Sequence, residues 1–153
     1  MKYFYKYTNK FCNLFIAEDS GAISNILYKK DNLPNDFKTG ETPLIKKTAK
    51  QLDEYFDGKR KVFDLPIIMH GTDFQLKVWK ALQKIPYGKT LSYLELAEKI
   101  GNKKACRAVG MANNRNPISI IVPCHRVIGK NGKLVGYAGG LELKQILLNL
   151  EKN

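Results

Sequence analysis

The sequence has few residues of the kinds that form disulfides or bind metals. It contains three cysteines, Cys12, Cys106 and Cys124, and two histidines, His70 and His125. The cysteines are odd in number, and no cysteines or histidines stand at the close spacing of a zinc motif. We therefore expect neither a disulfide framework nor a bound metal.

Long apolar runs are also missing. The longest, such as residues 120–124, are far shorter than the roughly 20 residues that cross a membrane as a helix. The first ten residues alternate between polar and aromatic and lack the apolar core of a secretory signal. We expect a cytoplasmic protein that does not contact a membrane. Its 153 residues are enough for one ordinary domain or two small ones.

Acidic residues are scarce, above all in the second half of the chain. The chain has 26 basic and 14 acidic residues and a net charge of +12. Residues 1–70 carry a net charge of +3, and residues 71–153 carry +9. A basic half is typical of proteins that bind nucleic acid, although a merely lysine-rich protein would look the same.

The apolar pattern predicts an α+β fold with two parts. Residues 1–65 are interpreted as a small α/β domain with strands over 2–7, 13–18 and 22–29. Thr42 and Pro43 then cap a helix that ends at Gly58. Residues 66–71 are expected to form a linker, and 72–153 a mainly helical domain.

The second part contains a predicted helix-turn-helix. Capping boxes at Thr72 and Ser92 each predict the start of a helix, and Gly101 predicts the end of the second one. Asn102 is expected to cap a third helix that ends near Ala112, with small residues on one side. Two short helices joined at a glycine are typical of DNA-binding helix-turn-helix units.

The candidate nucleophile is Cys124. It follows an apolar run over residues 118–122 that is interpreted as a buried strand, and it precedes His125. A thiolate needs a base or a positive neighbour, which His125 could supply through a water or across a turn. Residues 71–153 contain only five acids, and Glu151 is one that could orient the histidine. The alternative is an inert buried cysteine beside a surface histidine.

Several motifs carry a resemblance that covers roughly residues 71–151. The most specific is IVPCHRVI at residues 121–128. The others are GTDFQ at 71–75, VW at 78–79, IPYGKTLSY at 85–93, RAVG at 107–110, NP at 116–117 and GYAGGL at 136–141. In order and spacing they resemble the O6-alkylguanine-DNA alkyltransferases. Residues 51–58 and 63–66 match that family more loosely.

The resemblance implies a reaction and a fold. A member of this family moves an alkyl group, mainly methyl, from O6 of guanine, and by expectation from O4 of thymine, onto its own cysteine. The thioether is not reversed, so each molecule acts once without a cofactor. The expected partner is double-stranded DNA containing the lesion, bound by a monomer through the minor groove with the damaged nucleotide flipped out. The implied fold is a ribonuclease H-like N-terminal domain and a C-terminal domain with a winged-helix-like helix-turn-helix.

The resemblance also implies roles by position. Cys124 matches the alkyl acceptor, His125 the base that acts through a water, and Glu151 the carboxylate that orients it. Asn116 matches the asparagine that ties the site's backbone together. Tyr93 and Arg107 match the residues that extrude the nucleotide and fill its place. Further substrate and DNA contacts are implied at Lys104, Ala105, Cys106, Arg115, Tyr137, Ala138 and Gly139.

Three other functions compete with this one. Alkyltransferase-like proteins bind alkylated DNA without repairing it, but they lack the acceptor cysteine that Cys124 supplies. A transcription regulator would use the helix-turn-helix for base-specific binding and transfer no alkyl group. A Cys–His hydrolase is the weakest of the three, because nothing in the sequence resembles a pocket for an acyl substrate.

Overall fold

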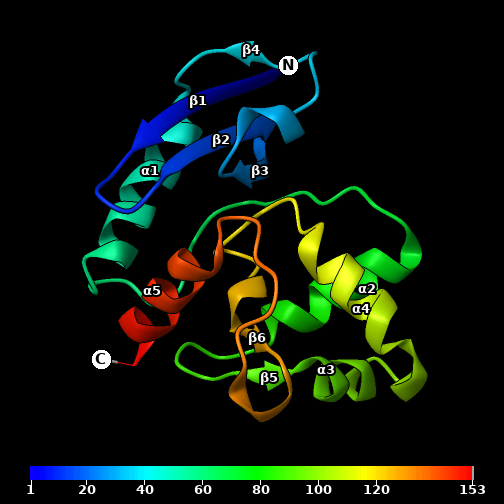
Figure 1. Cartoon of the computed structure of the whole chain (residues 1–153). Coiled ribbons are helices and arrows are strands. Elements are labelled where there is room, and N and C mark those ends of the chain that lie inside the picture. The colour runs from blue at the N-terminus through cyan, green and yellow to red at the C-terminus, as the bar shows by residue number, and fades with distance from the viewer. Residues whose placement is uncertain (153) are drawn as a thin grey trace. The chain divides into compact units, whose positions relative to one another are not determined.

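The computed structural model describes residues 1–152 and divides into two compact units (Figure 1). One unit comprises residues 1–69, and the other begins at His70. The boundary falls inside residues 66–71, where the sequence predicts a linker. No helix among the described residues is long and apolar enough to cross a membrane.

The first unit is built on a four-stranded sheet with the strand order β3-β2-β1-β4. Strands β1 (Lys2–Thr8), β2 (Asn13–Asp19) and β3 (Ala22–Leu27) pair antiparallel, and the short β4 (Lys38–Thr39) runs parallel to β1. Ser20 and Gly21 turn between β2 and β3 with φ of 53° and 92°, as a two-residue hairpin turn requires. The turn falls in the gap between the strands predicted over 13–18 and 22–29.

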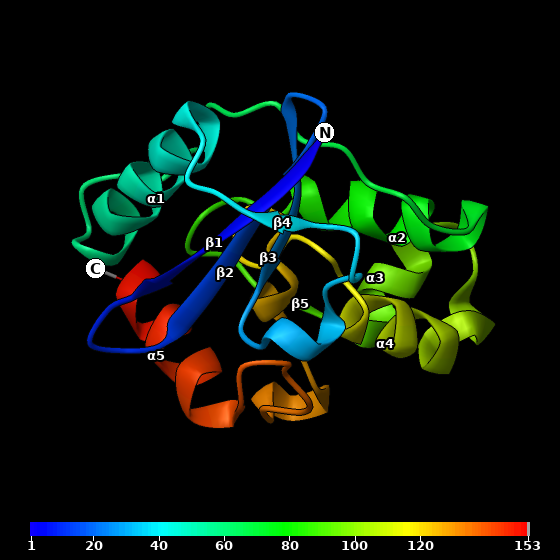
Figure 2. The same cartoon turned by 90° about the horizontal axis from the view of Figure 1, so that it is seen from above.

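Helix α1 (Pro43–Phe56) packs along this sheet (Figures 1 and 2). The Thr42 hydroxyl accepts a hydrogen bond from the Ile45 backbone N–H, and Pro43 occupies the first helical position, so the predicted cap is confirmed. Ile45, Leu52 and Tyr55 lie on the buried face of the helix. The apolar spacing of the sequence therefore identifies the correct face.

Residues 66–68, expected in the linker, extend the sheet of the first unit. The Ile23 backbone N–H donates to the Pro66 carbonyl, and the Ile68 N–H donates to the Ile23 carbonyl. Ile23 and Ile67 form an isolated parallel bridge. These residues therefore satisfy backbone groups of β3.

Three helices form the centre of the second unit: α2 (Asp73–Gln83), α3 (Tyr93–Lys99) and α4 (Cys106–Asn114). Helices α2 and α3 both contact α4, and Figure 2 shows the three together. Both predicted capping boxes are present, at Thr72 and at Ser92. Two short strands, β5 (Leu91–Ser92) and β6 (Val127–Ile128), pair in parallel and were not predicted.

Helix α4 differs from the sequence prediction at its start. Residues Lys103–Ala105 form a 3₁₀ turn, and Asn102 makes no side-chain cap. Ala112 is buried, and its carbonyl accepts a 2.9 Å hydrogen bond from the Trp79 indole N–H. Ala112, one of the small residues of this helix, is therefore covered by α2.

Residues 118–122 form a loop and not the predicted strand. Ser119 and Val122 bridge each other within the loop, and Ile120 has a φ of 74°. A positive φ is strained for a β-branched residue. The Asn116 side chain closes the loop by bonding to backbone atoms at both of its ends, so β-propensity alone misled the prediction.

The unit ends with a glycine-rich loop and helix α5 (Leu141–Glu151). The loop turns at Gly140, whose N–H donates to the Tyr137 carbonyl. The last residue of this helix, Glu151, is buried.

Candidate active site

Cys124 opens a 3₁₀ turn, η3 (Cys124–Arg126), that follows the loop closed by Asn116. Its side chain is buried with 4% of the residue exposed. Burial raises the pKa of the Cys124 thiol to about 11, while Asn116, the cation of Lys144 and the backbone act to lower it. At neutral pH the buried thiol is therefore protonated, and a nearby base must take its proton before it can attack.

His125 is fully buried beside Cys124 in the same turn. Its Nε2 lies 2.6 Å from Glu151 Oε2, at the end of α5. A carboxylate is acceptor-only when ionised, so the neutral ring carries its proton on Nε2 and its lone pair on Nδ1. The tautomer assigned from this contact leaves Nδ1 as the basic atom.

The pKa of His125 is lowered, chiefly because burial penalises the imidazolium. Contact with Glu151 opposes this effect, and the cations of Arg126 and Lys144 add to it. A neutral histidine near pH 7 is ready to accept a proton, as a general base must be.

Arg126 fixes the position of the Glu151 carboxylate. Its Nε donates to Oε1 at 2.8 Å and its Nη2 donates to Oε2 at 3.1 Å, which is a bidentate pair. Its Nη1 donates to the Ile85 carbonyl at 2.7 Å. The Gly88 N–H, at 3.3 Å from Oε1, completes the surroundings of the carboxylate. The buried pair holds the Glu151 carboxylate toward His125.

Asn116 ties the backbone before Cys124. Its Nδ2 donates to the Val122 carbonyl at 2.7 Å and to the Ile118 carbonyl at 3.4 Å, and its Oδ1 accepts from the Ile118 N–H at 3.0 Å. The Asn116 side chain thus bonds to backbone groups that would pair with a neighbouring strand if residues 118–122 formed one.

Tyr93 and Lys144 meet at a single backbone oxygen. The Tyr93 hydroxyl donates to the Val135 carbonyl at 3.1 Å, and Lys144 Nζ donates to the same oxygen at 3.0 Å. Lys144 also reaches the Gly136 carbonyl at 3.5 Å. Burial raises the pKa of Tyr93, and Cys124 adds to that rise, which places the phenol within electrostatic range of the thiol.

Sequence reasoning missed Arg126 and Lys144 as parts of the site. Both are buried, although basic residues in this half were interpreted as a DNA-facing charge. A signal for Lys144 was available, because Lys144, Leu147, Leu148 and Glu151 share one face of the closing helix. A lysine inside an apolar stripe is unusual unless its ammonium has partners.

The predicted DNA contacts lie on and around α4. Lys104, Arg107 and Arg115 are exposed, whereas Ala105 and Cys106 are half-buried. None of these five is among the partners of Glu151 or His125 given above.

The predicted pocket loop lies between Val135 and α5. Tyr137 and Gly139 are half-buried, and Ala138 is exposed. Among the described residues no group of three or more His, Cys, Asp or Glu side chains could hold a metal ion.

Known proteins share this arrangement of elements and motifs. Residues 73–153 match the family model described as 6-O-methylguanine DNA methyltransferase, DNA binding domain. The chain belongs to the O6-methylguanine-DNA methyltransferase family. A relative from Methanosarcina mazei, named methylated-DNA–protein-cysteine methyltransferase, is 50% identical over 144 residues, covering 92% of this chain and 90% of the relative.

Further relatives of this methyltransferase family span both units. The constitutive methylated-DNA–protein-cysteine methyltransferase of Bacillus subtilis is 47% identical over 146 residues, covering 91% of this chain and 88% of the relative. The crystal structure of Mycobacterium tuberculosis OGT in complex with DNA superposes with a TM-score of 0.91 at 43% identity. That match covers 98% of this chain and 92% of the other.

Proposed function

We propose that this chain repairs alkylated DNA by moving an alkyl group, methyl above all, from O6 of guanine onto Cys124. The observation that carries the proposal is the buried series Cys124, His125 and Glu151 in a chain of this family. The series supplies a nucleophile, a base in the correct tautomer and a carboxylate that orients the base.

The transfer is a displacement at a saturated carbon. His125 Nδ1 takes the thiol proton through a water, and the resulting thiolate of Cys124 attacks the alkyl carbon. The C–S bond forms as the C–O6 bond breaks, and guanine leaves with both electrons of the broken bond and takes up a proton. Lys144, which favours the thiolate form of Cys124, stabilises the charge before the attack. The product is a thioether, so the protein acts once and consumes no cofactor.

The finer geometry of the proposal concerns how the base reaches Cys124. The thiol is buried, and a guanine stacked inside a duplex cannot meet it, so the nucleotide must leave the stack. The exposed Arg107 would fill its place from the minor groove, where the small Ala105 allows close approach. Asn116 would hold the loop before Cys124, and Tyr93 would exchange its hydrogen bond to the Val135 carbonyl for one to guanine N3. The loop over Tyr137, Ala138 and Gly139 would wall the guanine, and thymine alkylated at O4 would enter the same way.

The two units would have different folds, and the second would bind DNA. The antiparallel β1–β3 with β4 parallel to β1 supports a ribonuclease H-like first domain. Helices α3 and α4 with the β5–β6 pair support a winged-helix-like second domain that binds DNA. Lys104 and Arg115 would contact phosphates beside α4.

Intact-protein mass spectrometry tests the reaction. The chain is incubated with a duplex oligonucleotide containing O6-methylguanine, and a matched duplex with unmodified guanine is the control. We expect a mass gain of one methylene unit, found only with the modified duplex and mapped to the peptide containing Cys124. Methylation mapped to Cys106 or Cys12, or none at all, would contradict the proposal.

Transfer rates for Arg107→Ala test the extrusion step. The unstacked gap costs a few kcal/mol, so we expect a loss of about 10-fold to 100-fold on a paired duplex. The loss should be much smaller on the free modified base and on a mismatched duplex. Lys104→Ala is the matched control and should weaken binding to any duplex alike. An equal loss on all three substrates would show that Arg107 shapes the site and does not support extrusion.

A further inference from the structure

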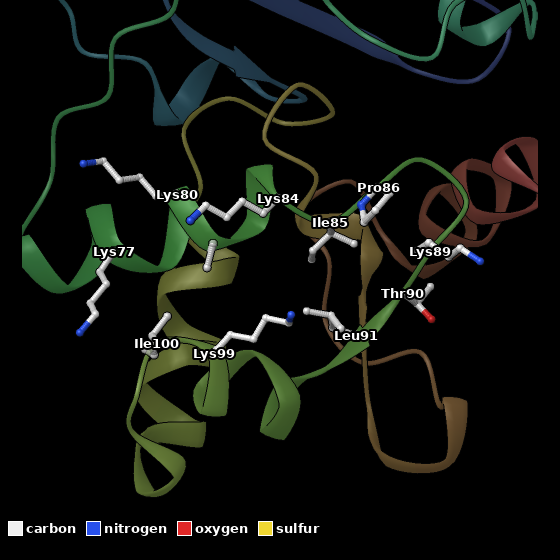
Figure 3. A pocket seen from close by; sticks show the side chains of 11 residues that line it. Lys77, Lys80, Lys84, Ile85, Pro86, Lys89, Thr90, Leu91, Lys99 and Ile100 are labelled. Atoms are coloured by element: carbon white, nitrogen blue, oxygen red, sulfur yellow. The ribbon is translucent and has the colours of Figure 1, made fainter.

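The C-terminal unit has a concave surface that shares one residue with the network around Cys124, Ile85, whose carbonyl accepts from Arg126. This hollow, here called the lysine pocket, has a volume of about 640 Å³ (Figure 3). Binding pockets for discrete ligands have volumes of this order. Its walls come from α2, from the segment between α2 and β5, from β5, and from the end of α3.

The charge of the lysine pocket has one sign. Lys77 and Lys80 of α2 and Lys84, the residue that caps its C-terminus, are spaced i, i+3 and i+7 along one side of the helix. Lys99 extends across the hollow from α3 (Figure 3), and Lys89 stands at the far edge. No carboxylate is among the eleven lining residues. Figure 3 shows the side-chain nitrogens of Lys84 and Lys99 nearest to the hollow, whereas those of Lys77, Lys80 and Lys89 point outward, so the pocket presents a positive potential to an anion.

The floor of the lysine pocket is aliphatic. Ile85 and Ile100 are buried with 4% and 6% exposed, and Ala81 and Leu91 are half-buried beside them. The lining contains no aromatic ring on which a base could stack and no arginine to fork onto a phosphate. The surface thus combines aliphatic contact with point charges at its edge.

We propose that the lysine pocket binds an acidic peptide segment of a partner protein. An aliphatic side chain of the segment rests on the floor of Ile85, Leu91 and Ile100, and neighbouring carboxylates meet the lysines. A nucleic-acid backbone would satisfy the charges but would leave the aliphatic floor uncovered, so a peptide fits better. Ile85 faces the pocket and also holds Arg126 through its carbonyl, but none of the pocket lysines is among the partners of Cys124, His125 or Glu151 given above, so the proposal does not depend on alkyl transfer.

Fluorescence anisotropy with a defined peptide tests the proposal on the full chain. The probe is a fluorescein-labelled peptide of four aspartates followed by two leucines. We expect saturable binding that weakens as salt rises, because exposed charges are screened. A control peptide with serines in place of the leucines should bind roughly tenfold more weakly, because it buries less apolar surface. Equal binding of the two peptides would overturn the role of the floor and with it the proposal.

Paired charge variants locate the binding. Lys84→Glu with Lys99→Glu should weaken peptide binding by at least about tenfold, because two attractions become repulsions. Lys46→Glu with Lys47→Glu makes the same change in net charge on exposed residues of α1 and should change the affinity by less than about twofold. Equal losses in both double variants would show that only the overall charge attracts the peptide, which would overturn the proposal.

Two further measurements separate the pocket from DNA binding and from folding. Lys84→Gln with Lys99→Gln removes the charges without reversing them and should also lose peptide affinity, with an unchanged thermal midpoint. Methyl transfer to a short duplex should stay at the wild-type rate in both pocket variants. If an unmodified duplex lost affinity by the same factor as the peptide, the pocket would belong to a DNA surface and the peptide proposal would be wrong.

Discussion

Cys12 in the first unit and Cys124 in the second have similarly raised pKa values but different neighbours. Burial raises the pKa of each thiol to about 11. Beside Cys12 the opposing influence is the Asn9 side chain, whereas Cys124 has Asn116 and the cation of Lys144, with His125 next in the chain. Cys12 is half-buried and Cys124 is buried, so a raised pKa is common to both thiols and the groups around each thiol decide whether it can react.

The ion pairs of the two units also differ in their burial. In the first unit Lys2 pairs with Asp36 and Arg60 pairs with Glu54 on partly exposed side chains. In the second unit His125, Arg126 and Glu151 form a buried network. Isolated buried charges are costly, and in this network each charged group has a partner.

The largest difference between the two cysteines is expected when each thiol is replaced by a hydroxyl. Cys124→Ser should abolish alkyl transfer, because a serine hydroxyl is a far weaker nucleophile near neutral pH. Cys12→Ser should leave the rate within about twofold of wild type, since no base accompanies that residue. Single-turnover assays with an O6-methylguanine duplex measure both. Residual repair by Cys124→Ser above a few per cent would mean that another residue accepts the alkyl group.

Removing one carboxylate charge from each unit tests the buried network. Glu151→Gln leaves Arg126 uncompensated, so we expect a loss of about 3–5 kcal/mol in the free energy of unfolding, together with slower transfer. Glu54→Gln breaks the partly exposed pair with Arg60 and should cost at most about 1 kcal/mol. Urea denaturation gives both values. Equal losses would show that burial of the Arg126–Glu151 pair does not increase the cost of removing its carboxylate charge.

The pH dependence of transfer distinguishes two roles of Lys144: an electrostatic effect on Cys124 and a structural effect on the loop. Lys144→Met removes a cation that lowers the pKa of Cys124, so transfer near neutral pH should slow by about tenfold. The rate–pH profile should shift to higher pH, and raising the pH should restore part of the rate. Lys2→Met, in the first unit, should leave the profile unchanged. A loss that is the same at every pH would assign Lys144 to holding the loop alone.

The smallest effect expected is on stability through His125. Its pKa is lowered in the folded chain from the usual 6.5. The unfolded state therefore binds the proton more readily, and stability is lost as the pH falls through about 6.5 toward the lowered value. Urea denaturation between about pH 8 and pH 5 should show a shallower decline for His125→Gln than for wild type. Residues 1–69 contain no histidine and contribute nothing to this difference.

Local signals predicted much of the fold. The capping boxes at Thr72 and Ser92 and the turn at Ser20 are set by neighbouring residues, so a short stretch of sequence contains the whole cause. The loop over 118–122 was missed because its conformation depends on the Asn116 side chain. The inward turn of Ala112 depends on Trp79, 33 residues away in the chain.

The site was predicted in part for the same reason. Cys124 and His125 are adjacent in the sequence, and Glu151 is one of only five acids in its half. Arg126 and Lys144 looked like the other basic residues, because charge alone cannot distinguish a buried cation from a solvated one. Their partners, the Glu151 carboxylate and the Val135 carbonyl, become neighbours only in the folded unit.

The shared acceptor at Val135 has a consequence for sequence variation. Both Tyr93 and Lys144 bond to a backbone oxygen, while the side chain of Val135 is 49% exposed. A backbone carbonyl is present whatever residue occupies the position. Position 135 can therefore vary among many side chains without loss of the junction, although it lies at the contact of α3 with α5. Side-chain substitutions at position 135 would therefore not reveal the role of its carbonyl. Replacing the peptide bond that contains this carbonyl by an ester would reveal it.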